Sequence, residues 1–584
     1  MAFSLSRFTI TENAYFFRIK KAISKRVIKS VIASASVGKK GPFLYKKIKE
    51  VQTYNSVNYL ITSAVFKYES NPTFLTIGTE MEIKYGYLLL VEFDNYLVIS
   101  KRGTSEFLEL LEKQIVEIDY TTLSKFKITA STQYKKLGIN NLDTSKRAMR
   151  RATYEAEDVK GALSTISTGN KIVSSLKIKN SLGLTSIAIG TSRVNDLGNK
   201  VDVKEFCLWC NKICSQITTF KPISTYLDNF AEPLNYEREI KGLKPISILF
   251  NFSSFLDDVD AGLISKVYYE NSGSNREIKL KPIVENHDLC MDVVYNGTSK
   301  QYEIKNNFDS SLILKKSKSS IGVYGSKLKY IYIEYNSGEI VNLLGRINKE
   351  SLFIVSFQNI DIRYSTRTLF KDTKLLGNID YFLKSIETST ALKSALSEKG
   401  NVVSASSSFD KTSLFGIIES TISSEQYLLC DDFGDEWADY IGFTPNKTIR
   451  FYHAKSSSKK YSASAFHDLV SQAIKNIGNF DFNRDLTSKK IKISSFYSGC
   501  KIKRLRKGKA ASCFNDLKET YNSPNIIREI VLVIDFFNKV DLENELKRLK
   551  AGKAKNQTIQ ILWLLSTLIG TCQERGINVR IITN

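Results

Sequence analysis

The order of predicted helices and strands between residues 401 and 584 constrains the fold of this chain more than any other feature. Hydrophobic periodicity predicts a short amphipathic helix and then three strands, over residues 413–420, 426–430, 437–443 and 449–454. A helix over residues 462–477 follows, because apolar residues recur there at helical spacing. The order is therefore α-β-β-β-α. Beyond it, the pattern predicts a strand, two helices and a final strand, over residues 526–537, 542–549, 558–575 and 577–582.

The first 400 residues have the pattern of a β-rich region with helical inserts. Apolar runs flank Asp94-Asn95 and Gln358-Asn359, as in β-hairpins, and residues 329–335 alternate in polarity. A helix is predicted over residues 202–217, with Asp202 as its N-cap. Its Cys207, Cys210 and Cys214 have the spacing of a buried helical stripe, and no histidine lies close in sequence, so we predict core positions rather than a zinc site.

The length of 584 residues is too great for one hydrophobic core. Residues 221–245 hold three of the eight prolines and residues 404–408 form a polar tract, so we place boundaries near residues 220 and 400. We expect an α+β multidomain protein. Its regions would be an N-terminal α+β region of unknown function over residues 1–220, a β-rich recognition or regulatory region over 221–400, and an α/β domain over 401–584.

Charge and composition restrict the class of protein. With 42% hydrophobic and 25% charged residues, the chain has a globular composition and not a disordered or fibrous one. The formal net charge of +24 favours nucleic acid as a partner, and contact with ribosomes or membrane surfaces would share that argument. Sparse cysteines, and the lack of an apolar segment of ~20 residues or a secretory signal, predict a cytoplasmic protein without a membrane partner.

Three polar residues lie on neighbouring predicted strands, where metal-dependent phosphodiester hydrolysis would need them. Asp439 is on the second strand, and His453 and Lys455 are two residues apart at the end of the third, so strand alternation points the latter two toward the same face. Since adjacent strands lie about 4.8 Å apart, the three side chains can converge on one ion and one water. Asp and Lys among apolar neighbours are costly unless paired or metal-bound. The pattern therefore predicts a divalent-metal site.

Residues 430–455, CDDFGDEWADYIGFTPNKTIRFYHAK, resemble the PD-(D/E)xK nuclease superfamily, which has the restriction-endonuclease-like fold. The resemblance covers residues 410–584 and rests on Asp439, on the triplet His453-Ala454-Lys455 and on the order of elements. It implies an αβββαβ core and Mg²⁺ as the cofactor. Asp439 would then be the principal metal ligand, the Ala454 carbonyl a second ligand and Lys455 the catalytic cation. The resemblance further implies a helix carboxylate at Glu419 and a substrate or water contact at Gln472.

One position departs from the superfamily's pattern, because His453 stands where an acidic residue is usual. Imidazole is a poor ligand for Mg²⁺ and a better one for Mn²⁺ or Zn²⁺. Three alternatives follow: His453 binds a softer ion, it orients Lys455 or the scissile phosphate, or it marks a degenerate site. Glu436 or Glu419 would supply the missing carboxylate.

Two basic clusters are candidates for contact with phosphate groups. The first follows the predicted core and comprises Lys501, Lys503, Arg504, Arg506, Lys507 and Lys509. The second comprises Lys146, Arg147, Arg150 and Arg151. For each of them, a solvated loop or helix surface is the alternative.

We therefore expect a metal-dependent endonuclease that hydrolyses DNA phosphodiester bonds, with RNA as an alternative substrate. Such architectures look like bacterial anti-phage defence or restriction effectors, here gated by the N-terminal region. The chain has no glycine-rich nucleotide-binding motif, so a helicase or ATPase would be a separate partner, and a phage component is a further candidate trigger. The alternative from another class is a catalytically inactive nucleic-acid-binding or assembly subunit. Whether the chain forms a homo-oligomer stays open.

Overall fold

The computed structural model describes most of the chain. It leaves out residues 1–7, 40–41, 73, 77–79, 142–150, 164–167, 169–170, 253–254, 256–257, 260, 272–273, 280–288, 307–308, 373–374 and 482–484. The fold is mixed α/β, rich in strands and built on several sheets. The chain divides into two compact units, of which the first contains mainly residues 1–140 and 172–228, and the second mainly residues 229–584.

The first unit is built on one large, mainly antiparallel sheet with the strand order β2-β3-β4-β5-β1-β11-β10-β9-β7-β8. The bounds of its outer strands are β2 (Phe43–Tyr54), β3 (Val57–Ser70), β7 (Gln133–Asn141) and β8 (Arg151–Glu155). The predicted hairpin is confirmed as β4 (Glu82–Phe93) and β5 (Tyr96–Arg102), and Asp94 in the turn has a φ of 46°. The predicted helix is α4 (Val203–Thr219). It begins with a capping box, in which Asp202 and Glu205 each bind the other's backbone N–H.

The three cysteines of α4 lie in the core of the first unit. Cys207, Cys210 and Cys214 are all buried on one face of the helix. Burial, followed by the charge of Asp202, raises the pKa of the Cys207 thiol to about 12. A zinc ligand needs the thiolate. The prediction of a core stripe is therefore confirmed.

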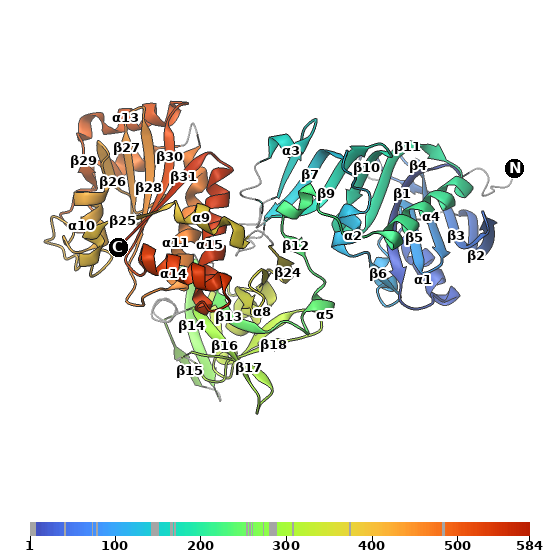
Figure 1. Ribbon diagram of the computed structural model, residues 1–584, viewed down its shortest axis with the longest axis horizontal. Helices are drawn as coiled ribbons and strands as arrows, with labels where there is room; N and C mark the ends of the chain where they lie inside the picture. The colour runs from blue at the N-terminus through green and yellow to red at the C-terminus, as the bar shows by residue number, and fades with distance from the viewer. Residues whose placement is uncertain are drawn as a thin grey trace. The chain divides into compact units, whose positions relative to one another are not determined.

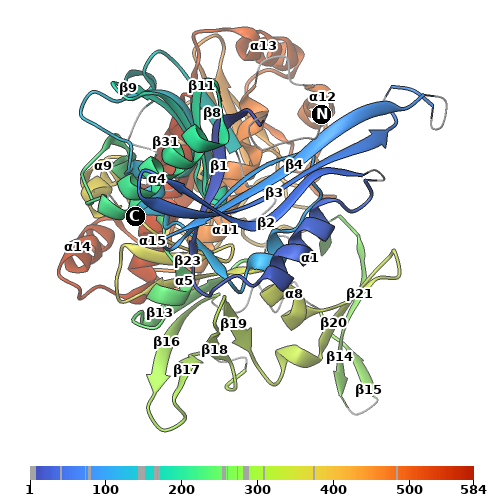
Figure 2. The same ribbon diagram turned by 90° about the vertical axis from the view of Figure 1, so that its right-hand side faces the viewer.

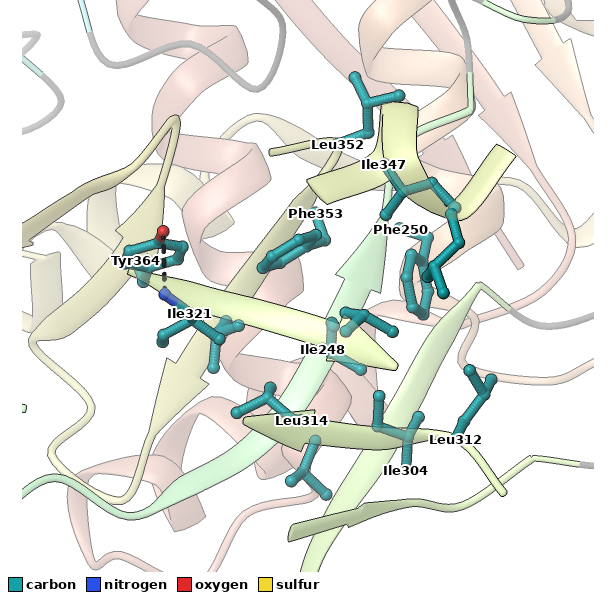
Figure 3. Packing of buried hydrophobic residues seen from close by; sticks show 14 of the residues in the cluster. Ile248, Phe250, Ile304, Leu312, Leu314, Ile321, Ile347, Leu352, Phe353 and Tyr364 are labelled. Atoms are coloured by element: carbon teal, nitrogen blue, oxygen red, sulfur yellow. Dashed lines mark hydrogen bonds between the residues drawn. The ribbon is translucent and has the colours of Figure 1, made fainter. Parts of the chain in front are cut away.

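In the second unit, residues 229–400 contribute a sheet with the order β12-β24-β23-β22-β13-β16-β17-β18-β19. Its outer strands are β12 (Glu232–Pro233), β24 (Thr368–Lys371), β23 (Ile362–Ser365), β16 (Cys290–Asn296), β17 (Gln301–Ile304), β18 (Ile313–Lys316) and β19 (Ile321–Tyr324). At its centre, β13 (Pro245–Phe250) pairs with β22 (Phe353–Phe357). Apolar side chains pack closely on this sheet, and the Ile321 N–H donates to the Tyr364 hydroxyl at 3.2 Å (Figure 3). A small separate sheet, β15-β14-β20-β21, lies beside α8 (Leu343–Glu350) (Figure 2).

The C-terminal part of the second unit has a seven-stranded mixed sheet with the order β25-β31-β30-β28-β27-β26-β29 (Figure 1). Three strands form an antiparallel meander, and β28, β30, β31 and β25 run parallel. The predicted elements occur in the predicted order: α10 (Leu414–Ile417), β26 (Tyr427–Cys430), β27 (Tyr440–Thr444), β28 (Thr448–Lys455), α11 (Ala463–Asn476), β30 (Ile527–Ile534), α14 (Lys539–Lys550), α15 (Asn556–Gln573) and β31 (Ile577–Thr583). Further elements between α11 and β30 were not predicted: α12 (Thr487–Ile493), β29 (Leu505–Lys507) and α13 (Ala510–Asn522). The described elements thus begin with the order α-β-β-β-α.

Residues on both sides of position 400 belong to the same unit, which differs from the predicted boundary there. The strand β25 (Ile386–Thr388) pairs with β31 and so belongs to the C-terminal sheet. From α15, Trp563 packs edge-to-face against Phe370 at 5.6 Å between ring centroids, and the Arg363 guanidinium lies 4.9 Å from the Trp563 ring centroid. Both partners come from the nine-stranded sheet. The buried helix α15 therefore joins the two sheets, which explains why the polar tract at 404–408 is no domain linker.

Within the described residues, no helix combines the length and the apolar character needed to cross a membrane.

Candidate metal centre

Three carboxylates gather where the chain passes from β26 to β27. The loop that connects these strands runs from Asp431 to Asp439, and it is closed by a hydrogen bond from the Asp431 N–H to the Asp439 carbonyl at 2.9 Å. Asp432, Glu436 and Asp439 each offer an oxygen within 4.8 Å of the others. We call these three residues the acidic triad. Asp432 and Asp439 are buried and Glu436 is half-buried.

Each member of the acidic triad is held by a specific contact. The Ala454 N–H of β28 donates to Asp439 Oδ2 at 2.7 Å. The Tyr497 hydroxyl donates to Asp432 Oδ2 at 2.6 Å, and the Phe433 N–H donates to Glu436 Oε2 at 3.2 Å. The triad is thus fixed by a neighbouring strand, a distant tyrosine and its own loop.

One lysine faces the triad. Lys399 Nζ lies 2.6 Å from Asp432 Oδ2 and 3.8 Å from Glu398. Burial alone would lower the pKa of Lys399, but the charge of Asp432 and their hydrogen bond outweigh it, so the pKa is raised. Lys399 lies in the segment between β25 and α10, outside the region 401–584 in which the site was predicted.

The electrostatic balance of the triad is unfavourable for three carboxylates. Burial, followed by repulsion from Glu398, Glu436 and Asp432, raises the pKa of Asp439 well above its usual value. Burial and the charge of Asp432 likewise raise the pKa of Glu436. A single lysine cannot neutralise this group of acids. A divalent cation would do so, and a set of oxygen donors suits Mg²⁺ or Mn²⁺ rather than a softer ion. The residues therefore fit the predicted cofactor.

The neighbouring acids of the same sequence cluster have a different role. Asp431 is fully buried and forms ion pairs with Lys489 at 2.8 Å and Lys492 at 2.7 Å. The Trp437 ring lies 4.2 Å below Lys489, and the Trp437 N–H donates to Asp431. Asp435 binds Ser488 and Lys489. These contacts anchor the loop to α12 (Thr487–Ile493), so Asp431 and Asp435 are structural.

His453 lies outside the acidic triad. It alternates along β28 with Tyr452 and Ala454, whose side chains pack in the core together with Phe415 of α10, so the His453 ring leaves the opposite face of the sheet. The imidazole is buried, and neither ring nitrogen has a hydrogen-bond partner among the described residues. Burial lowers the pKa of His453 to about 3. A nearby ionised carboxylate would instead raise it. The expectation that Asp439 and His453 share an ion is therefore not supported, because strand alternation separates them.

The other predicted catalytic residues occupy varied positions. The Ala454 N–H donates to Asp439, whereas the resemblance implied the Ala454 carbonyl as a metal ligand, a role that stays a prediction. Lys455 ends β28 half-buried, on the same face as His453, and Gln472 is exposed on α11. Glu419 is half-buried and is not in the triad: it forms a two-pronged ion pair with Arg506, at 2.6 and 2.9 Å, and accepts a hydrogen bond from the Tyr440 hydroxyl at 2.9 Å. This pairing neutralises Glu419 without a metal.

The residues of the predicted basic run have different surroundings in the structure. Arg504 is buried and donates to the carbonyls of Cys430 and Asp432 at 3.1 and 2.7 Å, and Lys507 donates to the Ser423 carbonyl at 2.7 Å. With Arg506 on Glu419, three of the six cations bind groups of the protein. Lys501, Lys503 and Lys509 are exposed. In the second cluster, Arg151 is exposed at the start of β8 (Arg151–Glu155), and Lys146, Arg147 and Arg150 lie outside the described residues.

Sequence reasoning missed three residues of this site. Asp432 belonged to the acidic cluster noted in the sequence, but nothing local distinguishes it from Asp431. Lys399 and Glu398 had no signal at all, because they reach the triad only through the packing of β25 and the segment that follows it.

No family model matches this sequence, and neither a curated protein nor a solved structure shows a significant match.

Proposed function

We propose that this protein is a metal-dependent nuclease that hydrolyses DNA phosphodiester bonds, with the acidic triad as its metal site. The observation that carries the proposal is the convergence of three oxygen ligands within 4.8 Å at the end of a β-meander, where Asp439 is held by the N–H of Ala454. The net charge of +24 supports a polyanionic substrate.

The proposed roles follow from the contacts. Asp432, Glu436 and Asp439 would hold Mg²⁺ or Mn²⁺, and such an ion polarises a phosphate and lowers the pKa of a bound water. The Ala454 N–H fixes the orientation of Asp439. Lys399, half-buried and held charged by Asp432, offers positive charge beside the site. Lys455 alternates to the face of β28 opposite to the acidic triad, so the expected convergence of Asp439 and Lys455 on one ion is not supported, and Lys399 replaces Lys455 as the proposed cation.

Metal binding and cleavage test this proposal. Purified full-length protein should bind Mn²⁺ in calorimetry and nick supercoiled plasmid when Mg²⁺ or Mn²⁺ is present. Asp439→Asn keeps an oxygen for the Ala454 N–H but removes a charged ligand, and should weaken Mn²⁺ binding at least about 100-fold. The matched control is Glu519→Gln, on the exposed surface of α13 (Ala510–Asn522), which should leave both readouts unchanged.

Two outcomes would contradict the proposal. If the wild type binds no divalent ion, the triad is not a metal site. If it binds Mn²⁺ and nucleic acid but cleaves neither DNA nor RNA, the chain is a binding or assembly subunit. An anti-phage role and gating by the N-terminal region stay predictions from the resemblance, and assays of phage infection in cells with and without Asp439→Asn test the first of them.

A further inference from the structure

One half of the first unit's sheet has a polar face. The strands β1 (Ile10–Ile19), β11 (Arg193–Val201), β10 (Gly183–Ala188) and β9 (Lys171–Asn180) lie next to one another in that order. On one face their side chains are mainly apolar and buried, with Thr185 and Asp196 as polar exceptions, and Phe16 contacts Trp209 of α4 at 5.5 Å between ring centroids. α1 (Lys25–Ala35) packs into the core on the other face of the β2–β5 half. Where this other face continues over β1, β11, β10 and β9, it has mainly polar and small side chains.

The strand register places polar and small side chains there in two rows. The first row crosses the four strands through Tyr15, Arg193, Ala188 and Ser175, and the second through Asn13, Asn195, Ser186 and Lys177. All eight residues are half-buried. Since neighbouring strands lie about 4.8 Å apart, each row spans roughly 15 Å. We call these two rows, together with Lys179 and Leu184 of the next register pair, the polar face.

Cations are arranged around Tyr15 and along β9. Arg193 Cζ and Lys101 Nζ lie 5.6 and 5.5 Å from the Tyr15 ring centroid, and Arg193 Nε donates to Asn13 Oδ1 at 2.8 Å, which orients the guanidinium. Lys177 and Lys179 follow on β9, with Lys179 exposed.

Acidic residues at the borders of this face are already paired with other lysines. Glu155 is bound to Lys136 at 2.9 Å and Glu157 to Lys135 at 2.7 Å, and the charges of Lys177 and Lys179 further lower the pKa of Glu155 and of Glu157, respectively. Glu106 lies 3.9 Å from Lys101, and Glu117 pairs opposite Phe17 on β6 (Ile115–Glu117). The positive groups Arg193, Lys177 and Lys179 thus lie inside the two rows and on their edge, whereas the acids lie outside them.

We infer that the polar face binds single-stranded nucleic acid. Lysine and arginine supply contacts to phosphates, and an oriented guanidinium beside an aromatic ring offers a surface on which a base can stack. Small side chains such as Ser175, Ser186 and Ala188 let a strand approach the sheet closely. The same side chains are too short to enter the groove of a duplex, which is about 8.5 Å deep on its major side. This inference goes beyond the proposed nuclease activity and does not depend on it.

Binding of labelled oligonucleotides tests the inference. Full-length protein is titrated into fluorescein-labelled 20-mers of single-stranded DNA, single-stranded RNA and duplex DNA, in EDTA so that metal-dependent cleavage cannot interfere. The variant Lys177→Glu/Lys179→Glu should weaken single-strand binding about tenfold or more and reduce its salt slope by about 1.4, the value for two phosphate contacts. The milder Lys177→Gln/Lys179→Gln should show a smaller loss in the same direction.

The control has the same change in net charge elsewhere in the first unit. Lys29→Glu/Lys204→Glu alters exposed lysines on α1 and α4 and should change the affinity by less than twofold. If the polar-face variant and the control variant lost affinity equally, the inference would be overturned, since binding would then depend on the net charge of the protein and not on the polar face. Tighter binding of the duplex, or no single-strand binding by the wild type at micromolar concentrations, would also overturn it. Comparison of the DNA and RNA arms identifies which strand is preferred. Because EDTA removes the ion, failure here is distinguishable from failure of the nuclease proposal.

Discussion

Asp439 is a carboxylate whose surroundings oppose its charge. It is buried beside Glu436 and Asp432, and its pKa is raised well above the usual value because of burial and these neighbours. A raised carboxyl pKa means that the folded protein binds a proton more tightly than the unfolded chain does. At a pH above that pKa, the ionised group therefore destabilises the fold. Such a site lowers the stability of the ligand-free protein, and a ligand that binds the folded state can restore that stability.

Asp439→Asn should therefore stabilise the metal-free protein. At pH 8 the substitution removes a buried charge and keeps a hydrogen-bond acceptor for the Ala454 N–H, and we expect a gain of about 1 kcal/mol or more in the free energy of unfolding. Urea denaturation in EDTA measures it. Saturating Mn²⁺ should reverse the order of stability, since only the wild type binds the ion tightly. A less stable variant in EDTA would contradict the electrostatic account of the triad.

The lowered pKa of His453 predicts that the folded protein loses stability in acid. Its pKa is about 3 in the folded protein, against 6.5 when unperturbed. Between these values the unfolded chain takes up the proton, so the stability that is present above pH 6.5 falls as pH falls toward 3, by about 2 kcal/mol between pH 6.5 and pH 5.

His453→Leu should remove this part of the pH dependence, and urea unfolding at pH 5 and pH 7.5 measures it. The variant also removes two buried ring nitrogens without partners, so its stability at pH 7.5 should be equal to or above that of the wild type. It should still bind Mn²⁺. If a folded His453→Leu variant lost Mn²⁺ binding, His453 would be a member of the metal site after all.

At the scale of single elements, α10 depends on a close approach to the preceding turn. A Cβ on Gly416 would meet the Asp410 carbonyl oxygen at 2.1 Å, and the Gly416 N–H is capped by the Ser413 hydroxyl at 3.1 Å. The Asp410 carbonyl also accepts a hydrogen bond from the Ser413 N–H. The turn therefore cannot move without loss of the cap.

Gly416→Ala should lower the free energy of unfolding by about 2 kcal/mol, because overpacking outweighs the higher helix propensity of alanine. Gly478→Ala is the control, since its Cβ would meet only Arg575 Nη1 at 3.9 Å. Thermal denaturation of both variants checks the difference, and an equal effect of the two would contradict the packing of α10.

At the scale of the whole molecule, α15 makes the two sheets of the second unit into one cooperative body. Trp563 is fully buried against Phe370 and Arg363 from one sheet, while α15 packs on α11 and β31 of the other. Trp563→Ala should cost about 3–5 kcal/mol. Hydrogen exchange should then rise together in β13 and β22 and in β30 and β31. A rise confined to one sheet would show that they are independent.

The same packing predicts that a fragment of residues 401–584 does not fold. It lacks β25 and Lys399, and it exposes the face of α15 that covers the nine-stranded sheet. Circular dichroism and size-exclusion chromatography check this, and a cooperatively folded monomer would contradict it.

Local patterns in the sequence were sufficient for the elements themselves. Period-2 and period-3.6 burial and caps such as Asp202 depend on residues close in the chain, so β26, β28, α11 and α15 were predictable to within a few residues. Asp439 was expected within the second strand but lies just before β27, and its hydrogen bond from the Ala454 N–H was not predicted. Its partners in the site were decided by contacts between residues far apart in sequence.

Only the tertiary structure decided which charges meet. Asp431 and Asp432 are neighbours in sequence, yet one pairs with lysines of α12 and the other faces Lys399. Arg504 and Arg506 belong to one basic run, yet one binds carbonyls and the other Glu419. The sequence determined the strands and helices because burial alternates along each of them. It did not determine the charge pairs, because their energies depend on distances that exist only after those elements have packed.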